Sequence, residues 1–227
     1  KVSIIMPLKN GLPFIKETLE SIQKQTYKNL ELLITNDHSS DESLSFLNEV
    51  KELDSRIKVF QNSGKGIISA LNKSYENAEG TYITRMDADD IMVPNKLEKL
   101  INLLENHGEK HVAIGAVKYF SSDGVQDGFL RYEKWLNDLT KTGNNYQEIY
   151  KECVVPSPSW MMFKKDFDSI GGFKHNLYPE DYDLAFRMYE NGIIIIPNGE
   201  ILHYWRDHKN RASRNDENYL DNTFFDI

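Results

Sequence analysis

Short apolar runs alternate with amphipathic stretches along the first 120 residues of the chain. The apolar runs have the length and alternation of strands, and the stretches between them place apolar residues at helical spacing. The predicted strands are residues 2–8, 30–36, 57–60, 80–84 and 111–120. The predicted helices are residues 14–25, 42–53, 67–77 and 94–107. This alternation is typical of an α/β fold with a mostly parallel, Rossmann-like central sheet and helices on both faces.

The pattern loosens in the second half of the chain. Residues 121–159 are mainly polar, with a helix predicted at 131–139. A short strand is predicted at 160–163, then a helix at 180–191 that Gly192 ends. Two final strands are predicted at 193–196 and 201–205. The sequence contains no internal repeat or low-complexity segment, so we expect one domain over residues 1–227.

The composition restricts the possible functions more than it restricts the possible folds. The net charge of −8 argues against a general nucleic-acid binder, because such proteins need basic surface to meet phosphates. Cys153 is the single cysteine, which excludes an internal disulfide and fits a reducing compartment. The chain opens at Lys1 directly on a predicted strand, so we expect it to be part of a longer protein.

Three carboxylates follow the predicted strand at residues 80–84. Asp87, Asp89 and Asp90 lie where that strand ends, and ligands of open α/β sheets bind at the carboxyl ends of strands. Like charges this close repel one another, and a divalent cation removes that cost. Carboxylate oxygens suit Mn²⁺ or Mg²⁺. The alternative at this point is an acidic turn that caps the next helix.

Asp37 ends another predicted strand, at residues 30–36. The carboxyl ends of parallel strands meet at one edge of a sheet, so Asp37, Asp87 and Asp89 should converge. The alternative for Asp37 is a local turn in which Asp41 caps the following helix.

Six short motifs occur in a fixed order along the chain. They are residues 3–7 (SIIMP), 36–41 (NDHSSD), 66–72 (GIISALN), 80–90 (GTYITRMDADD), 171–173 (GGF) and 180–184 (EDYDL). The ordered set resembles family 2 of the glycosyltransferases, which are inverting enzymes with the GT-A fold. The resemblance covers roughly residues 2–213. It implies a nucleotide-sugar-binding half at 1–120, an acceptor-side half at 121–213 and a tail at 214–227.

The resemblance assigns roles on the donor side. Asp37 would accept a hydrogen bond from the uracil ring of a UDP-sugar, since a carboxylate only accepts. Asp89 would hold Mn²⁺ or Mg²⁺ on the diphosphate, and Asp90 would orient its neighbours. The nucleotide-binding positions that the resemblance implies are Pro7, Leu8, Asp37, Gly66, Asn72, Arg85, Asp87, Ala88 and Arg206. The implied metal ligands are Asp89, Asp87 and His208.

Glu180 and Asp181 resemble the acceptor-side pair of that family, with Asp181 as the catalytic base. The acceptor hydroxyl must lose a proton as it attacks the anomeric carbon, and a positioned carboxylate can take it. The alternative is that both acids simply favour the amino-terminal end of a helix, where the helix dipole stabilises negative charge. Arg85 is expected to pair with a neighbouring aspartate rather than to touch substrate.

The late segment at residues 205–213 resembles one that closes over the diphosphate in relatives. His208 would be a further metal ligand there, and Arg206 and Arg211 would meet phosphate oxygens. The alternative is a solvated, charged tail. His203 is a rival for the ligand role but lies inside the strand pattern, where a buried histidine with satisfied hydrogen bonds is expected.

The region from 121 to 159 matches no motif, although it should face the acceptor. Trp135, Trp160 and Tyr178 are candidates to stack on a sugar ring, or else plain core or surface aromatics.

The resemblance implies a metal-dependent enzyme that moves a sugar from a UDP-sugar to a hydroxyl of a glycan or lipid-linked saccharide. A hexosyl or N-acetylhexosaminyl unit and a role in bacterial polysaccharide biosynthesis are expected. Two alternatives are an inactive nucleotide-sugar-binding scaffold and, less favoured, a sugar-phosphate nucleotidyltransferase, which should carry a glycine-rich basic loop after the first strand. We expect a cytoplasmic location, at the inner face of the cell membrane if segments missing from this chain attach it there.

Overall fold

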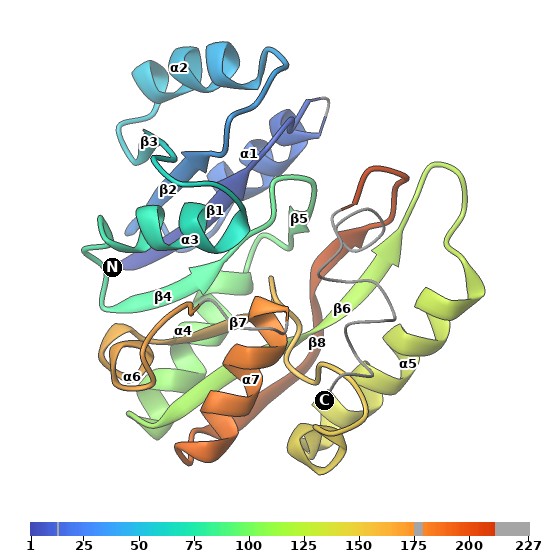
Figure 1. Cartoon of the computed structure of the whole chain (residues 1–227). Coiled ribbons are helices and arrows are strands. Elements are labelled where there is room, and N and C mark those ends of the chain that lie inside the picture. The colour runs from blue at the N-terminus through green and yellow to red at the C-terminus, as the bar shows by residue number, and fades with distance from the viewer. Residues whose placement is uncertain (13, 175–178, 212–227) are drawn as a thin grey trace.

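The computed structural model describes residues 1–12, 14–174 and 179–211. Within them, one eight-stranded sheet has the order β3-β2-β1-β4-β7-β6-β8-β5 (Figure 1). The strands are β1 Val2–Leu8, β2 Leu30–Asn36, β3 Ile57–Gln61, β4 Tyr82–Arg85, β5 Ile91–Met92, β6 His111–Phe120, β7 Trp160–Phe163 and β8 Ile194–Arg206. The helices are α1 Ile15–Gln23, α2 Ser43–Leu53, α3 Ile67–Tyr75, α4 Lys96–His107, α5 Asp127–Thr142, the 3₁₀ helix η1 Asn145–Glu148, α6 Lys164–Ser169 and α7 Glu180–Glu190.

The first four strands in chain order form a parallel block, as predicted. β1 lies between β2 and β4, with Leu8 opposite Asn36 and Ile5 opposite Arg85. This register brings the carboxyl ends of β2 and β4 to the same edge of the sheet, one residue before Asp37 and two before Asp87. β7 then pairs antiparallel with both β4 and β6, so the sheet is mixed beyond β4.

Helices cover both faces of the sheet, which confirms the prediction. Because strand side chains alternate between faces, Ile4 and Met6 of β1 pack in one core cluster and Ile5 in another. The first cluster takes in apolar residues of α1, α2 and α4, and the second those of α3, α6 and α7. Figure 1 shows α3 and α7 in front of the sheet and α4 behind it.

The end of the sheet differs from the prediction of two final strands. β8 is a single strand that runs along β6, with Asn198 opposite Gly115 and Ile201 opposite Ala116. The residues between Asn198 and Ile201 bulge out of the register, so the turn-like sequence Pro197-Asn198-Gly199 does not end the strand. No helix among the described residues is long and apolar enough to cross a bilayer.

The stretch after β4 also differs from the prediction of a helix from Pro94. Ile91 and Met92 form β5, which pairs antiparallel with Tyr204 and His203 of β8. The helix α4 begins only at Lys96. The pairing holds the acidic turn between β4 and β5 against the far end of β8, which is how residues more than 100 positions apart come together.

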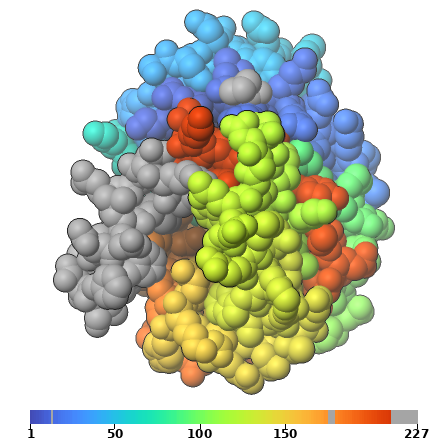
Figure 2. Space-filling model, turned by 90° about the vertical axis from the view of Figure 1, so that its right-hand side faces the viewer, coloured from blue at the N-terminus to red at the C-terminus, as the bar shows by residue number. Residues whose placement is uncertain are grey.

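Helix α5 is longer than the predicted helix at 131–139. Its apolar side packs Leu136 and Phe129 against Val117 of β6 and Trp205 of β8. Figure 2 shows the segment from the end of β6 through α5 across one face of the molecule, beside the end of β8.

Candidate active site

The acidic turn lies between β4 and β5 at the edge where the parallel strands end. Asp87 and Asp89 are partly exposed, whereas Asp90 is fully buried. Thr18 of α1 supports the turn, because its single hydroxyl proton is shared between the carbonyl oxygens of Ala88 at 3.0 Å and Asp90 at 2.8 Å. The turn therefore presents two carboxylates outward on a fixed backbone.

Arg85 joins the acidic turn to the start of α7. Its Nε donates to Asp87 Oδ1 at 2.9 Å, and its Nη1 donates to Glu180 Oε1 at 2.6 Å. Arg85 and Glu180 are both nearly fully buried, so this charge-assisted pair is shielded from water. The expectation that Arg85 pairs with a neighbouring aspartate is confirmed, and the same guanidinium brings together the two predicted halves of the site.

Asp181 follows Glu180 in the first turn of α7. Its Oδ2 accepts a hydrogen bond from the Ser157 hydroxyl at 2.8 Å, and its Oδ1 accepts one from the Tyr182 N–H at 2.8 Å. Burial, and then the charge of Glu180, raise the pKa of Asp181 to about 6. A carboxylate that is held at both oxygens and has a pKa near neutrality is suited to take a proton.

The end of β8 and the residues after it are hydrogen-bonded to the acidic turn. The Arg206 N–H donates to Asp90 Oδ1 at 2.8 Å, and Arg206 Nε donates to the carbonyl of Asp89 at 2.6 Å. His208 Nε2 lies 2.7 Å from Asp89 Oδ2. The guanidinium of Arg206 also stacks between Phe14 and Phe120 and pairs with Glu17, so the turn and this segment form one unit. Of the late segment, Arg211 is described, whereas residues 212–213 and the tail 214–227 lie outside the described residues.

His203 is a buried histidine with hydrogen-bond partners, as expected, and it does not reach Asp89. Its Nε2 lies 2.9 Å from Asp90 Oδ2. Burial, and then the charge of Lys96, lower the pKa of His203. Burial raises the pKa of Asp90 well above its usual range, and the charges of Asp89 and Asp87 raise it further.

Asp37 lies after β2 and is almost fully buried. The Asn62 amide donates to its Oδ1 at 2.6 Å, and the Gly66 N–H lies 3.2 Å and 3.1 Å from its two oxygens. Gly66 has a φ of +89°, a conformation that other residues rarely adopt, so this close approach depends on glycine. The local turn of the alternative is also present, because Asp41 Oδ1 accepts the Ser43 N–H at 3.1 Å, but the cap residue of α2 is Glu42 and not Asp41.

The remaining predicted nucleotide-binding positions lie in β1, in the acidic turn and in α3. Leu8 is buried at the end of β1, and its carbonyl accepts the Asp37 N–H at 2.7 Å. Pro7 is half-buried in β1, Ala88 is half-buried in the acidic turn, and Asn72 is half-buried in α3. Pro7 and Ala88 therefore lie near the edge where β1 and β4 end, whereas Asn72 lies within α3.

The donor set fits a cation that arrives with a substrate. Among the residues that the structure describes, no three His, Cys, Asp or Glu side chains are grouped to hold a metal ion. Asp89 and His208 nevertheless offer a carboxylate oxygen and an imidazole nitrogen at one point, and Mg²⁺ or Mn²⁺ usually takes few protein ligands besides phosphate oxygens. Burial raises the pKa of Asp87 against the charge of Arg85, and the charge of Asp89 raises it further. A divalent cation would offset that repulsion.

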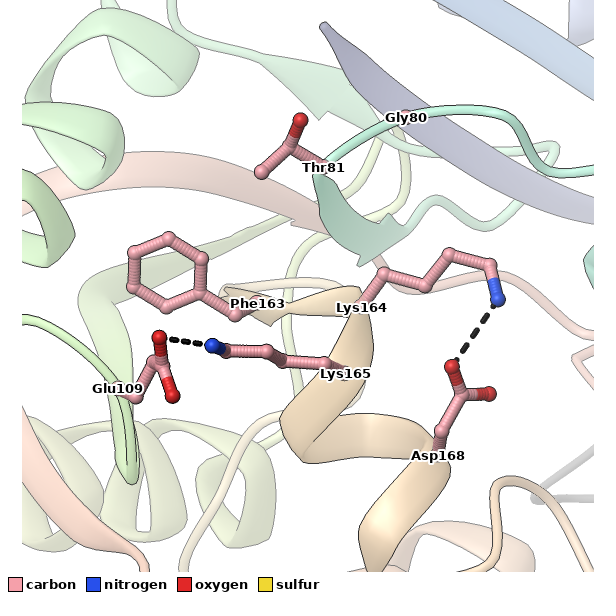
Figure 3. A pocket seen from close by; sticks show the side chains of 7 residues that line it. All are labelled: Gly80, Thr81, Glu109, Phe163, Lys164, Lys165 and Asp168. Atoms are coloured by element: carbon pink, nitrogen blue, oxygen red, sulfur yellow. Dashed lines mark hydrogen bonds and ion pairs between the residues drawn. The ribbon is translucent and has the colours of Figure 1, made fainter.

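A hollow of about 400 Å³ lies elsewhere on the molecule (Figure 3). It adjoins Gly80 and Thr81, which precede β4, whereas the acidic turn follows β4. Its lysines are already paired, Lys164 with Asp168 at 3.1 Å and Lys165 with Glu109. This hollow is therefore separate from the acidic turn.

Comparison with known proteins gives this arrangement a family. A family model described as Glycosyl transferase family 2 matches residues 3–171. The chain belongs to glycosyl transferase family 2. An uncharacterized glycosyltransferase from Haemophilus influenzae is 43% identical over 200 residues, which cover 80% of this chain and 58% of that protein. This family 2 chain thus spans less than two-thirds of the relative's length.

Solved structures confirm the predicted GT-A fold. TarS from S. aureus, crystallised in complex with UDP-GlcNAc, has a TM-score of 0.75 at 21% identity, covering 93% of this chain and 60% of that one. The mannosyltransferase PcManGT from Pyrobaculum calidifontis, in complex with GDP-Man and Mn²⁺, has a TM-score of 0.71 at 18% identity, covering 92% and 57%. At these identities the likeness concerns the fold of the family 2 chain.

The structure describes two of the three aromatic residues of the family 2 chain that were considered for stacking on a sugar ring. Trp160 is buried in the core and stacks on Phe167 at 5.7 Å, so of the two alternatives the structure supports a core aromatic. Trp135 is half-buried between two core clusters. Tyr178 lies outside the described residues.

Sequence reasoning missed three residues that support the site. Ser157 bonds Asp181, Asn62 bonds Asp37, and Lys96 is fully buried near His203. Lys96 had a signal, because it lies four residues before Leu100 on the apolar face of α4, where a charge is out of place. Ser157 lies between two prolines in an irregular segment, and no pattern in the sequence indicated its role.

Proposed function

We propose that this family 2 glycosyltransferase is a metal-dependent inverting enzyme. It would move a hexosyl or N-acetylhexosaminyl unit from a UDP-sugar to a hydroxyl of a glycan or lipid-linked saccharide. The observation that carries the proposal is the Arg85 bridge, because one buried guanidinium contacts both Asp87 of the acidic turn and Glu180 beside Asp181. This contact supports a single site in which the proposed donor-side and acceptor-side carboxylates would act together.

The donor side supports a nucleotide diphosphate. Asp89 and His208 would hold Mn²⁺ or Mg²⁺ on its phosphate oxygens, and the cation would stabilise the diphosphate as it leaves. Asp37 would face the base, where a carboxylate matches the ring N–H of uracil. The complexes of TarS with UDP-GlcNAc and of PcManGT with GDP-Man and Mn²⁺ support this class of donor.

The acceptor side supports direct displacement. Asp181 would take the proton of the acceptor hydroxyl as that oxygen attacks the anomeric carbon from the face opposite the diphosphate. Ser157 and the Tyr182 N–H fix the carboxylate in one orientation for this transfer. Holding both substrates in line supplies much of the remaining rate. The acceptor would be part of bacterial polysaccharide assembly on the cytoplasmic side of the membrane.

The test is calorimetric titration of UDP, GDP and dTDP, each with manganese and with a chelator. We expect UDP to bind, to bind more tightly than GDP or dTDP, and to lose most of its affinity when the chelator replaces manganese. Preference for GDP would overturn the choice of UDP. A folded sample that binds none of the three nucleotides would overturn the proposal and favour an inactive scaffold.

The pKa of Asp181 predicts an acidic limb in the pH profile. A base must be deprotonated to act, and burial with the charge of Glu180 raises its pKa to about 6. We therefore expect kcat/KM for transfer to be flat above that pH and to fall about tenfold for each pH unit below it. Circular dichroism at each pH separates this loss from unfolding. If kcat/KM instead falls with a midpoint near the ordinary aspartate pKa of about 4, the prediction is contradicted.

A further inference from the structure

A lysine with no exposed surface lies between the acidic turn and the segment that supports Asp181. Lys96 is the first residue of α4, and its side chain is fully buried. Its Nζ donates to the carbonyl of Pro158 and lies 3.3 Å from His203 Nδ1. A buried ammonium costs stability unless polar groups surround it, so its contacts, and not its apolar stem, account for its position.

The contact with His203 leads to the metal side of the site. Burial lowers the pKa of Lys96 to about 7, against the charges of Asp90 and Asp87. Below that pH the Lys96 ammonium can only donate, so His203 Nδ1 accepts and the ring proton is on Nε2. Nε2 then donates to Asp90 Oδ2, 2.9 Å away. The other oxygen of Asp90 accepts the Arg206 N–H at 2.8 Å. Lys96 is thereby connected through the buried side chains of His203 and Asp90 to the end of β8. The end of β8 also bonds the carbonyl of Asp89.

The contact with Pro158 leads to the base side. The residue before Pro158 is Ser157, whose hydroxyl donates to Asp181 Oδ2 at 2.8 Å. Arg85 Nη1 lies 3.4 Å from the same hydroxyl. Fixing the Pro158 carbonyl therefore fixes the backbone that carries the hydrogen-bond donor to Asp181. One buried side chain contacts the supports of both halves of the site.

We propose that Lys96 is a positioning residue that holds the Asp89 turn and the Ser157 segment at a fixed separation. The inference rests on the proposed function, because it takes Asp89 as a metal ligand and Asp181 as the base. In-line transfer requires donor and acceptor to meet within a narrow distance, and a misplacement of about 1 Å can cost about 100-fold in rate. A connection that runs through the protein interior is screened much less by water and salt than one at the surface.

The experiment uses Lys96→Met, which keeps the length of the side chain and removes the ammonium. We expect kcat to fall by about 10- to 100-fold with a smaller change in the KM for donor. Calorimetry should show a several-fold weaker manganese-dependent binding of UDP. Lys99→Met is the matched control, because Lys99 lies one turn further along α4 and pairs with Glu200 at the surface. It should behave as wild type in both measurements.

A double-mutant cycle tests the path to the base. Ser157→Ala removes the hydroxyl that holds Asp181, so the effect of Lys96→Met on kcat should be smaller in that background than in wild type. His203→Gln provides a second route if Lys96→Met does not fold. Its amide can still donate to Asp90 but offers Lys96 no acceptor at the Nδ1 position, so it should weaken manganese-dependent UDP binding several-fold, as Lys96→Met does, and lower kcat.

The outcomes separate the two proposals. If wild type fails to bind UDP with manganese, the proposed function fails. If wild type binds and Lys96→Met has wild-type kcat and UDP affinity per folded molecule, even at a lower melting temperature, the role of Lys96 is only structural and the inference is overturned. Equal multiplicative effects in both backgrounds would overturn the path through Ser157.

Discussion

Replacing Asp181 with asparagine is expected to lower kcat for sugar transfer by about 1,000-fold and to leave UDP binding unchanged. General base catalysis contributes about 100- to 10,000-fold, and an amide cannot take the proton. The substitution disturbs little else. The carbonyl of the introduced amide can still accept the Tyr182 N–H, and its NH₂ can donate to the Ser157 oxygen, which replaces the hydrogen bond that the carboxylate accepts. The measurement is transfer rate alongside calorimetric UDP affinity in the presence of manganese.

Asp168→Asn is the control for Asp181→Asn. It makes the same chemical change at an exposed ion pair with Lys164, in the hollow that lies apart from the acidic turn. We expect wild-type kcat for this variant. Transfer by Asp181→Asn within about threefold of wild type would show that another group is the base.

Replacing Asp89 with alanine is expected to remove the effect of manganese on UDP binding. The carboxylate beside His208 is the predicted ligand, and loss of a ligand should weaken metal-dependent binding by about 100-fold or more, since loss of supporting groups alone costs about 10- to 100-fold. The turn itself should persist. Arg206 Nε bonds the backbone carbonyl of residue 89, which alanine keeps. The measurement is UDP titration with manganese and with chelator.

Two further variants provide a second test and a control for the result with Asp89→Ala. His208→Ala should change metal-dependent binding in the same direction, because it removes the other proposed ligand at the same point. Asp138→Ala, at an exposed aspartate of α5, should leave it unchanged. If Asp89→Ala keeps the manganese-dependent gain in affinity, Asp89 is not a ligand.

The parallel half of the sheet could be predicted because the sequence patterns that specify it are local. Apolar runs and helical spacing identify β1 to β4 and the helices between them, and right-handed crossovers then align the strand ends. The predicted convergence of Asp37 and Asp87 follows from that alone. The direction of β7 could not be predicted, since a four-residue apolar run carries no information on its partners. β5 has two residues and exists only because β8 pairs with it.

The carboxylates of the site could be proposed from motifs, but their supports could not. The Arg85–Glu180 pair joins positions 95 residues apart, and no local pattern specifies such a contact. Ser157 lies in irregular chain, where periodicity says nothing of side-chain direction. Lys96 is the exception, because a charge at a core position of a helix conflicts with the pattern around it and calls for a buried partner.

The place of β7 between β4 and β6 has a consequence for how the protein is made. When a ribosome has released the first 120 residues, β4 and β6 both exist in sequence, but the strand that joins them does not. Each then presents an unsatisfied backbone edge to other nascent chains, the situation in which misassembly begins. The sheet closes only when residues 160–163 emerge, and β6 gains its second neighbour later still, with β8. Translation through the polar region 121–159 therefore sets how long the facing edges of β4 and β6 lack the strand that joins them.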